Sequence, residues 1–188
     1  KQTSNNNDPI LKLNIGLSAG VPVGDKEGIF EDTVKTAEHL CDIAQGQLAV
    51  TSEVKDLYES ENLNVSIDKK LMKVLNSNDE KFLNLLMDYT EREWSNTRLN
   101  ADDFSKSLGY SKSQLYRKMI SLTGKSPNNF INEYRLNKAL KLLNKKVENI
   151  SEVAYETGFN SPAYFSKCFQ NAFNMLPSTY IRHYANPL

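Results

Sequence analysis

The sequence predicts an α+β protein, in which a partial α/β segment is followed by an all-α domain with two helix-turn-helix units joined by a long helix. Two observations lead to this division. Strand-like alternation of apolar and polar residues occurs only in the first part of the chain, and from Asp79 the apolar residues recur at helical spacing. Two later segments, about fifty residues apart, are also similar to each other.

The first part contains strands and helices in alternation. Apolar residues at every second position from Leu11 to Leu17 predict a half-buried strand that ends near Gly20. Apolar residues at helical spacing predict a helix over 32–44, and 47–51 reads as a second strand before a short helix at 52–58. These elements are too few for an independent core, so we expect further strands upstream and a sheet with an open, apolar edge.

A polar stretch separates the two parts. Residues 60–77 are poorly periodic and offer one short strand candidate at 63–67, so we assign them to a linker. The predicted domains are a disordered tail at 1–9, the α/β segment at 10–59 and the helical domain at 78–188.

Opposite net charges distinguish the two parts, although the whole chain is neutral with 23 basic and 23 acidic residues. Residues 1–75 hold 8 basic and 12 acidic side chains, a net charge of −4. Residues 97–188 hold 13 basic and 6 acidic side chains, a net charge of +7. A basic domain favours a polyanionic partner such as nucleic acid, although a basic stretch alone is more often a solvated surface.

Composition and motifs exclude several classes of protein. Among the 188 residues, 39% are hydrophobic, and no apolar run approaches the roughly 18 residues of a membrane helix, so we expect no membrane partner. Cys41 and Cys168 lie far apart without metal-ligand spacing, which predicts no metal site and a reducing, cytoplasmic environment. No phosphate-binding loop or nucleophilic triad is visible, so we expect no cofactor and no catalytic residue. The first residues lack an initiating Met and a signal peptide, which predicts a part of a longer protein.

Two segments of the helical part are versions of one unit. Residues 99–119 read LNADDFSKSLGYSKSQLYRKM, and residues 150–169 read ISEVAYETGFNSPAYFSKCF. Gly109 corresponds to Gly158, and an aromatic residue follows each of them. Each segment reads as a short helix, a glycine-containing turn and a second helix that a serine caps, which is typical of a helix-turn-helix. The amphipathic stretch 126–146 predicts the long helix between the units.

The second helix of each unit keeps one face free. Leu115 and Met119 face inward in the first unit, and Phe165 and Phe169 do so in the second. The outward side chains are Lys112, Ser113, Tyr116 and Arg117 in the first unit, and Ala163, Tyr164 and Lys167 in the second. A free face of this kind can enter a major groove, and two such units in a basic domain favour DNA over a bundle without a ligand.

On these motifs, the C-terminal domain resembles the AraC/XylS-type transcription regulators from Asp79 to Arg182. The matching motifs are SKSQLYRK at 111–118, TGKSPNNFI at 123–131, RLNKAL at 135–140 and the whole second unit, with the trailing Pro177 and Tyr180. Asn174 stands where the family usually has glycine, and asparagine also tolerates the left-handed conformation.

The resemblance implies binding of double-stranded DNA by two recognition helices in successive major-groove segments, near a promoter and therefore beside RNA polymerase. By position, it makes Ser113, Tyr116, Arg117, Ala163, Tyr164 and Lys167 the candidates for base contact. Lys112 and Lys118 complete the DNA-binding set, with Lys118 expected on a phosphate. An effector would act through a region that precedes this sequence.

The segment from Leu11 to Val54 is similar to the later part of class III nucleotide cyclase domains, which implies a partial, ferredoxin-like α/β segment. The similarity rests on a strand ending in an IGxxxG-like turn, a GDxVNxAARL-like helix and a GQIxVS-like strand. Lys35 and His39 stand where that pattern has the Asn and Arg that stabilise the transition state, so catalysis is not expected. We expect His39 on an ordinary helix surface. The nearby acidic residues are expected to be solvated rather than to bind a metal: Asp25, Glu27, Glu31 and Asp32.

The sequence thus predicts a sequence-specific DNA-binding transcription regulator that is not an enzyme. One alternative is a residual nucleotide cyclase, against which Lys35 and His39 count. The other is a partner-binding helical module without DNA affinity, against which the retained Arg117, Lys118 and Lys167 count.

Overall fold

The computed structural model describes residues 13–20, 30–44, 46–62, 72–145 and 149–185. The chain divides into two compact units, residues 1–84 and 85–188. The division falls within a single helix, α3 (Ser77–Glu93), whereas the sequence predicts a boundary near the start of this helix, at 77–78. The first half of α3 therefore belongs to the N-terminal unit, where Asn84 is hydrogen-bonded to His39 of α1.

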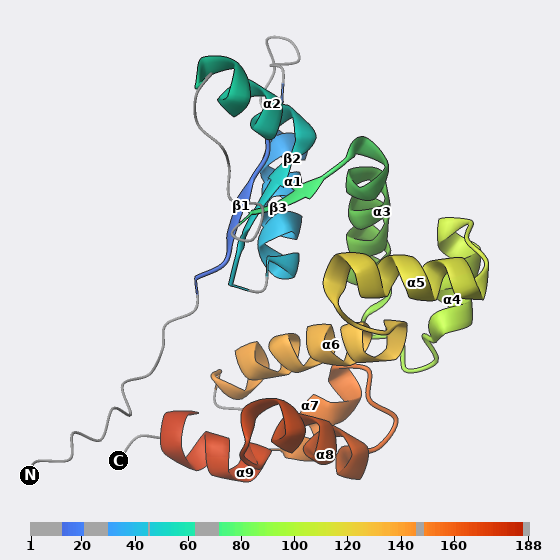
Figure 1. The fold of residues 1–188 in the computed structure, drawn as a ribbon. Coiled ribbons are helices and arrows are strands. Elements are labelled where there is room, and N and C mark those ends of the chain that lie inside the picture. Colours follow the sequence, from blue (N-terminus) through green and yellow to red (C-terminus); the bar gives the residue numbers. More distant parts are fainter. Residues whose placement is uncertain (1–12, 21–29, 45, 63–71, 146–148, 186–188) are drawn as a thin grey trace, which may run out of the picture. The chain divides into compact units, whose positions relative to one another are not determined.

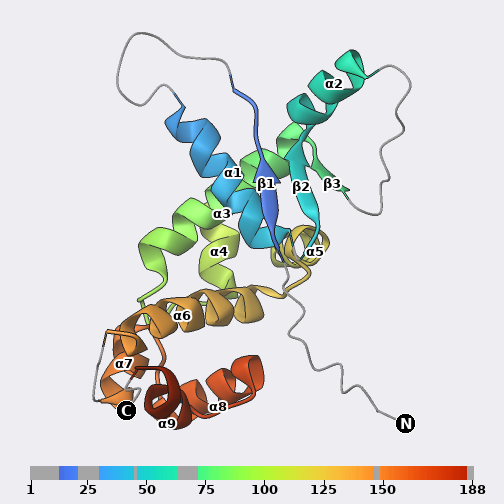
Figure 2. The same cartoon turned by 90° about the vertical axis from the view of Figure 1, so that its left-hand side faces the viewer.

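The N-terminal unit is built on a small parallel sheet. Its strands β1 (Ile15–Leu17), β2 (Leu48–Thr51) and β3 (Met72–Leu75) lie side by side in chain order, as Figure 2 shows. Two helices, α1 (Glu31–Ile43) and α2 (Ser52–Glu61), make the crossovers that parallel neighbours require. The described strands thus form a βαβαβ arrangement, and the ferredoxin-like arrangement stays a prediction.

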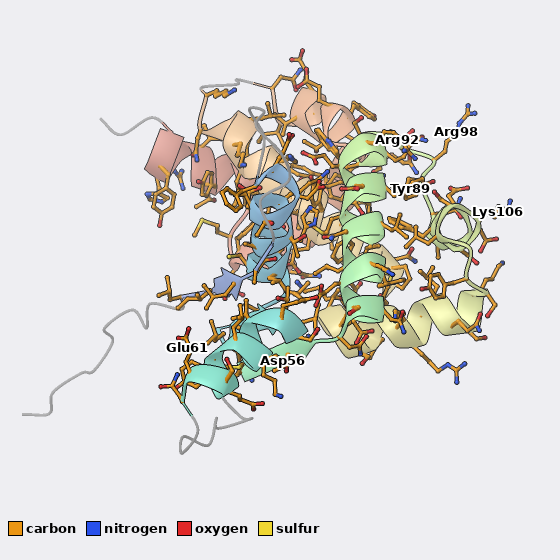
Figure 3. The ribbon with its side chains drawn as sticks, turned by 90° about the horizontal axis from the view of Figure 1, so that it is seen from above. Asp56, Glu61, Tyr89, Arg92, Arg98 and Lys106 are labelled. Atoms are coloured by element: carbon orange, nitrogen blue, oxygen red, sulfur yellow. The ribbon has the colours of Figure 1, made fainter. Side chains whose placement is uncertain are left out.

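Strand β3 corrects the predicted linker. Met72–Leu75 lies inside 60–77, yet it pairs with all four residues of β2. A strand of four residues that includes Lys73 is too short to show a clear alternation, so only its pairing reveals it. The strand predicted at 63–67 and the tail predicted at 1–9 lie outside the described residues. Helix α2 continues to Glu61, beyond the predicted end at 58, and carries the acidic side chains Asp56 and Glu61 labelled in Figure 3.

The apolar face of β1 is open, contrary to the half-buried strand that its alternation predicts. Leu13, Ile15 and Leu17 are 65%, 41% and 44% exposed. Helix α1 packs instead on the opposite face, at Gly16. The lack of a side chain there allows the close contact, because a Cβ at Gly16 would collide with the backbone carbonyl oxygen of Ala37 on α1. The close approach of α1 fixes which face of the sheet is covered.

His39 is buried rather than on an ordinary helix surface, so that expectation is wrong. Its side chain is 7% exposed, and Nδ1 donates to Oδ1 of Asn84 on α3 at 2.7 Å. The amide of Asn84 in turn donates to the hydroxyl of Thr36 at 3.0 Å. This polar chain joins α1 to the first half of α3, and a partner so distant in sequence gives no local signal.

The C-terminal unit is helical throughout its described part (Figure 1). After the second half of α3 come α4 (Ala101–Leu108), α5 (Lys112–Thr123), α6 (Pro127–Leu143), α7 (Ile150–Glu156), α8 (Pro162–Phe173) and α9 (Pro177–Tyr180), with a π-helical turn at Ile181–Ala185. Three of these helices begin at the predicted prolines, which have no backbone N–H to leave unpaired in the first turn. The long helix predicted over 126–146 is α6.

Phenylalanine rings form the core around the second helix-turn-helix unit. The ring centroid of Phe165 lies 5.2 Å from that of Phe159 and 5.7 Å from that of Phe169. All three side chains are buried, which confirms the inward positions predicted for Phe165 and Phe169. Leu140 of α6 is only partly buried, at the edge of this core.

Candidate DNA interface

The first helix-turn-helix unit consists of α4 and α5. Ser111 caps α5: its hydroxyl accepts from the backbone N–H of Gln114 at 3.4 Å, and the Gln114 side chain accepts from the Ser111 N–H at 3.0 Å. Gly109 ends α4 with a φ of 74°, in the left-handed region that favours glycine. A Cβ at Gly109 would meet nothing within 4 Å, so this glycine serves backbone conformation alone.

The second unit, α7 and α8, repeats this design with a crowded turn. Asn149 caps α7 and Ser161 caps α8, whose first residue is Pro162. Gly158 has a φ of 81°, and a Cβ there would lie 2.6 Å from the Trp94 carbonyl oxygen and 2.8 Å from Nε of Arg135. This glycine is therefore required for space as well as for conformation.

Arg135 of α6 links the turn at Gly158 to the segment that follows α3. The side chain is 6% exposed; its Nε donates to the Trp94 carbonyl at 2.8 Å and its Nη2 to the Asn96 carbonyl at 2.7 Å. The guanidinium also lies 5.9 Å from the centroid of the Phe159 ring. Burial lowers the pKa of Arg135. The sequence motif RLNKAL contains this residue, but only the fold shows that it joins three elements.

The outward face of α5 carries the predicted side chains of the first unit. Ser113, Tyr116 and Arg117 are exposed, and Arg117 Nε donates to the Ser113 carbonyl one turn earlier at 3.3 Å. Lys112 is exposed but forms an ion pair with Asp102 of α4 at 2.7 Å. Lys118 is only half-buried rather than fully outward. The geometry thus presents Arg117 and Tyr116 most directly.

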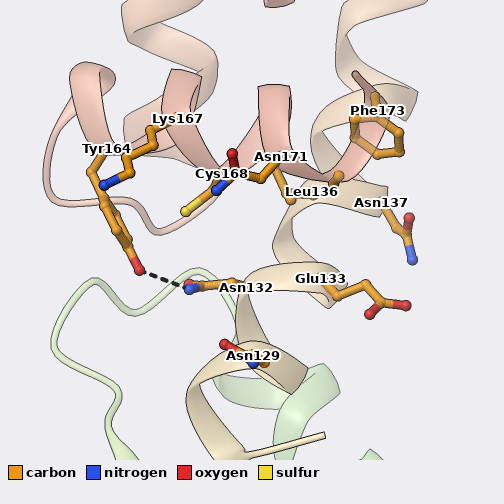
Figure 4. A pocket seen from close by; sticks show the side chains of 11 residues that line it. Asn129, Asn132, Glu133, Leu136, Asn137, Tyr164, Lys167, Cys168, Asn171 and Phe173 are labelled. Atoms are coloured by element: carbon orange, nitrogen blue, oxygen red, sulfur yellow. Dashed lines mark hydrogen bonds between the residues drawn. The ribbon is translucent and has the colours of Figure 1, made fainter. Parts of the chain in front are cut away.

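The outward face of α8 presents Ala163, Tyr164 and Lys167, all exposed as predicted. Tyr164 also leans toward α6, where Nδ2 of Asn132 donates to its hydroxyl at 3.0 Å (Figure 4). Asn132 was not among the predicted site residues, because it lies on α6 between the two units and belongs to neither. A groove of about 650 Å³ lies between α6 and α8, and its lining includes Asn132, Tyr164 and Lys167.

Further basic side chains lie near the first unit. Figure 3 labels Arg92 on α3, Arg98 in the following loop and Lys106 on α4. Arg92 stacks 5.2 Å from the ring centroid of Tyr89, which itself packs edge-on against Phe104 at 5.2 Å. Such cations can pair with phosphates but carry no base readout by themselves.

Among residues that the structure places, no three His, Cys, Asp or Glu side chains gather in a way that could hold a metal ion. Within the same part of the chain, no helix is both long and apolar enough to cross a membrane.

Comparison with known proteins identifies the helical unit. A family model described as a helix-turn-helix domain matches residues 104–183. An AraC-type transcriptional regulator from Chromobacterium violaceum superposes with a TM-score of 0.53 at 28% identity, over 60% of this chain and 100% of that one. The helical unit is an AraC-type helix-turn-helix domain.

Two curated relatives match part of this chain. Histidine kinase P4 of Formosa agariphila is 40% identical over 111 residues, which are 59% of this chain and 8% of that protein. The transcriptional regulator MtrA of Neisseria gonorrhoeae is 35% identical over 95 residues, 50% of this chain and 30% of that protein. The chain thus spans less than a third of either relative.

Proposed function

We propose that this chain is part of a transcription regulator and binds double-stranded DNA sequence-specifically, with α5 and α8 in successive major-groove segments. The observation that carries the proposal is the repeated unit: two capped helices, each after a left-handed glycine, each with buried apolar residues on one face and exposed polar ones on the other. An AraC-type domain is a DNA-binding domain, which supports the same reading.

The proposed contacts divide by chemistry. Arg117 can reach a guanine edge with two donors, and Tyr116 and Ser113 can contact neighbouring bases. Lys167 is the charged reader of the second unit. Lys112 and Lys118 are proposed on phosphates, and Ala163 is small enough to meet a thymine methyl group.

The proposal extends to partners beyond DNA. RNA polymerase at a promoter and an effector that acts outside the AraC-type domain are proposed partners, and the N-terminal unit, with its cyclase-like sequence, is the proposed sensory or interaction part. A DNA partner and two free thiols, Cys41 and Cys168, are our reasons for proposing the cytoplasm as its location.

Selection from a random pool of duplexes with the purified chain, followed by footprinting, tests the proposal. We expect one preferred sequence, protection of two major-groove segments about 10 base pairs apart, and an affinity that falls steeply with salt. Equal affinity for selected and scrambled duplexes would contradict sequence-specific binding. Protection of a single segment would show that only one unit docks.

A further inference from the structure

Tyr164 is the largest side chain on the outward face of α8, and its hydroxyl already has partners within the domain. Asn132 donates to that hydroxyl at 3.0 Å across the groove (Figure 4). A hydrogen bond with the Cys168 side chain, and then burial, raise the pKa of Tyr164, whereas the bond from Asn132 lowers it. The hydroxyl therefore stays protonated, with Asn132 bonded to its oxygen.

The ring of Tyr164 has a second contact within the domain, with the ring of Phe159. Its centroid lies 6.1 Å from that of the buried Phe159. Half of the side chain, 50%, is nevertheless exposed. Because the hydroxyl oxygen already accepts from Asn132, the ring carbons are the part of this half-exposed side chain that can contact a base without competing with a partner inside the domain.

A donor on a base edge would compete with Asn132 for the hydroxyl oxygen, and an acceptor on a base edge would compete with the Cys168 side chain for the hydroxyl proton. Loss of a neutral hydrogen bond of this kind weakens an equilibrium by about two- to twelvefold. Apolar contact with the ring carries no such cost, and in the major groove the C5 methyl group of thymine is the apolar feature that a ring can meet.

We propose that Asn132 is a positioning residue for DNA recognition: by holding the Tyr164 hydroxyl, it makes Tyr164 an apolar reader of a thymine methyl group. This inference rests on the proposed DNA binding and specifies how the second unit selects one base. It assigns a role in recognition to a residue of α6, outside both helix-turn-helix units.

The test uses the full chain and the duplex selected from the random pool. Each thymine is replaced singly by uracil, which removes only the methyl group, and the ratio of the affinities for the two duplexes is measured. The variants are Tyr164→Phe, Tyr164→Ala and Asn132→Ala. Asn137→Ala, the same change elsewhere on the α6 side of the groove, is the matched control. Circular dichroism melts show that each variant is folded.

For the unmodified chain we expect one thymine in the segment bound by α8 whose replacement weakens binding about three- to fivefold, the value of one buried methyl group. Tyr164→Phe should keep this ratio, because its ring still packs against Phe159 and has no hydroxyl that must be held away from the base. In Asn132→Ala, by contrast, the hydroxyl is released and can turn toward the base. Tyr164→Ala and Asn132→Ala should bring it close to one, and Asn137→Ala should leave it unchanged. A merely structural role of Asn132 would lower affinity for both duplexes equally.

Two results would overturn the inference while leaving DNA binding intact. One is a loss of the thymine preference in Tyr164→Phe, which would make the hydroxyl the reader. The other is an unchanged ratio in folded Asn132→Ala. Failure of the unmodified chain to prefer any duplex would instead refute the proposed function, and the inference with it.

Discussion

Gly158→Ala should destabilise the helical unit far more than the matched change Gly109→Ala. Both glycines have positive φ values, 81° for Gly158 and 74° for Gly109. An alanine in this left-handed conformation is strained, which lowers the free energy of unfolding by about 1–2 kcal/mol at either position. At Gly109 nothing lies within 4 Å of the new Cβ, and the strain is the whole cost. At Gly158 the Cβ would lie 2.6 Å from the Trp94 carbonyl oxygen, which is backbone and cannot swing away. Overpacking of this kind adds about 1–3 kcal/mol, for a total of about 2–5 kcal/mol.

Urea unfolding, followed by the fluorescence of Trp94, gives the free energy of unfolding of both variants. Trp94 is the single tryptophan of the chain, and its carbonyl oxygen is the atom that a Cβ at Gly158 would meet. A second comparison isolates the contact: in an Arg135→Ala background, Gly158→Ala should cost less than in the unmodified chain, because Nε of Arg135 no longer lies 2.8 Å from the added Cβ. Equal destabilisation by Gly158→Ala and Gly109→Ala would refute the reasoning, since it would mean that the second turn has room for a methyl group.

Other predictions concern binding, capping and catalysis. Arg117→Ala should cost about 1–3 kcal/mol on the selected duplex and much less on a scrambled one, measured by titration at fixed salt; equal losses on both would make Arg117 a phosphate contact. Asp102→Asn, which releases Lys112 from its ion pair, should raise affinity for all duplexes about two- to threefold at low salt, with little effect on stability, and an unchanged affinity would show that Lys112 does not meet DNA. Asn174→Ala should destabilise by about 1–2 kcal/mol because its φ is 56°, whereas Asn174→Gly should be tolerated; thermal melts of the two variants decide this. Incubation with ATP or GTP and Mg²⁺ or Mn²⁺ should yield no cyclic nucleotide, and metal-dependent product that Lys35→Ala abolishes would contradict this.

Much of the helical domain is determined locally and could therefore be predicted. Pro127 and Pro162 mark helix starts because a helix leaves its first N–H groups unpaired, and Gly109 marks an end because only glycine adopts its conformation without strain. The burial of Leu115 and Phe165 follows from their spacing along each helix. These rules act within a few residues, so the sequence alone was sufficient for them.

The sequence could not predict contacts between residues far apart in the chain. The pairing of β3 with β2, the burial of His39 against Asn84 and the bond from Asn132 to Tyr164 each join residues separated by more than twenty positions. No periodicity encodes such a partner, because side chains of these types are equally compatible with solvent. Lys112 and Tyr164 thus have the exposure that the sequence predicts, while the tertiary structure decides what each still offers to DNA: Lys112 is engaged by Asp102, and the hydroxyl of Tyr164 is held within the domain by Asn132.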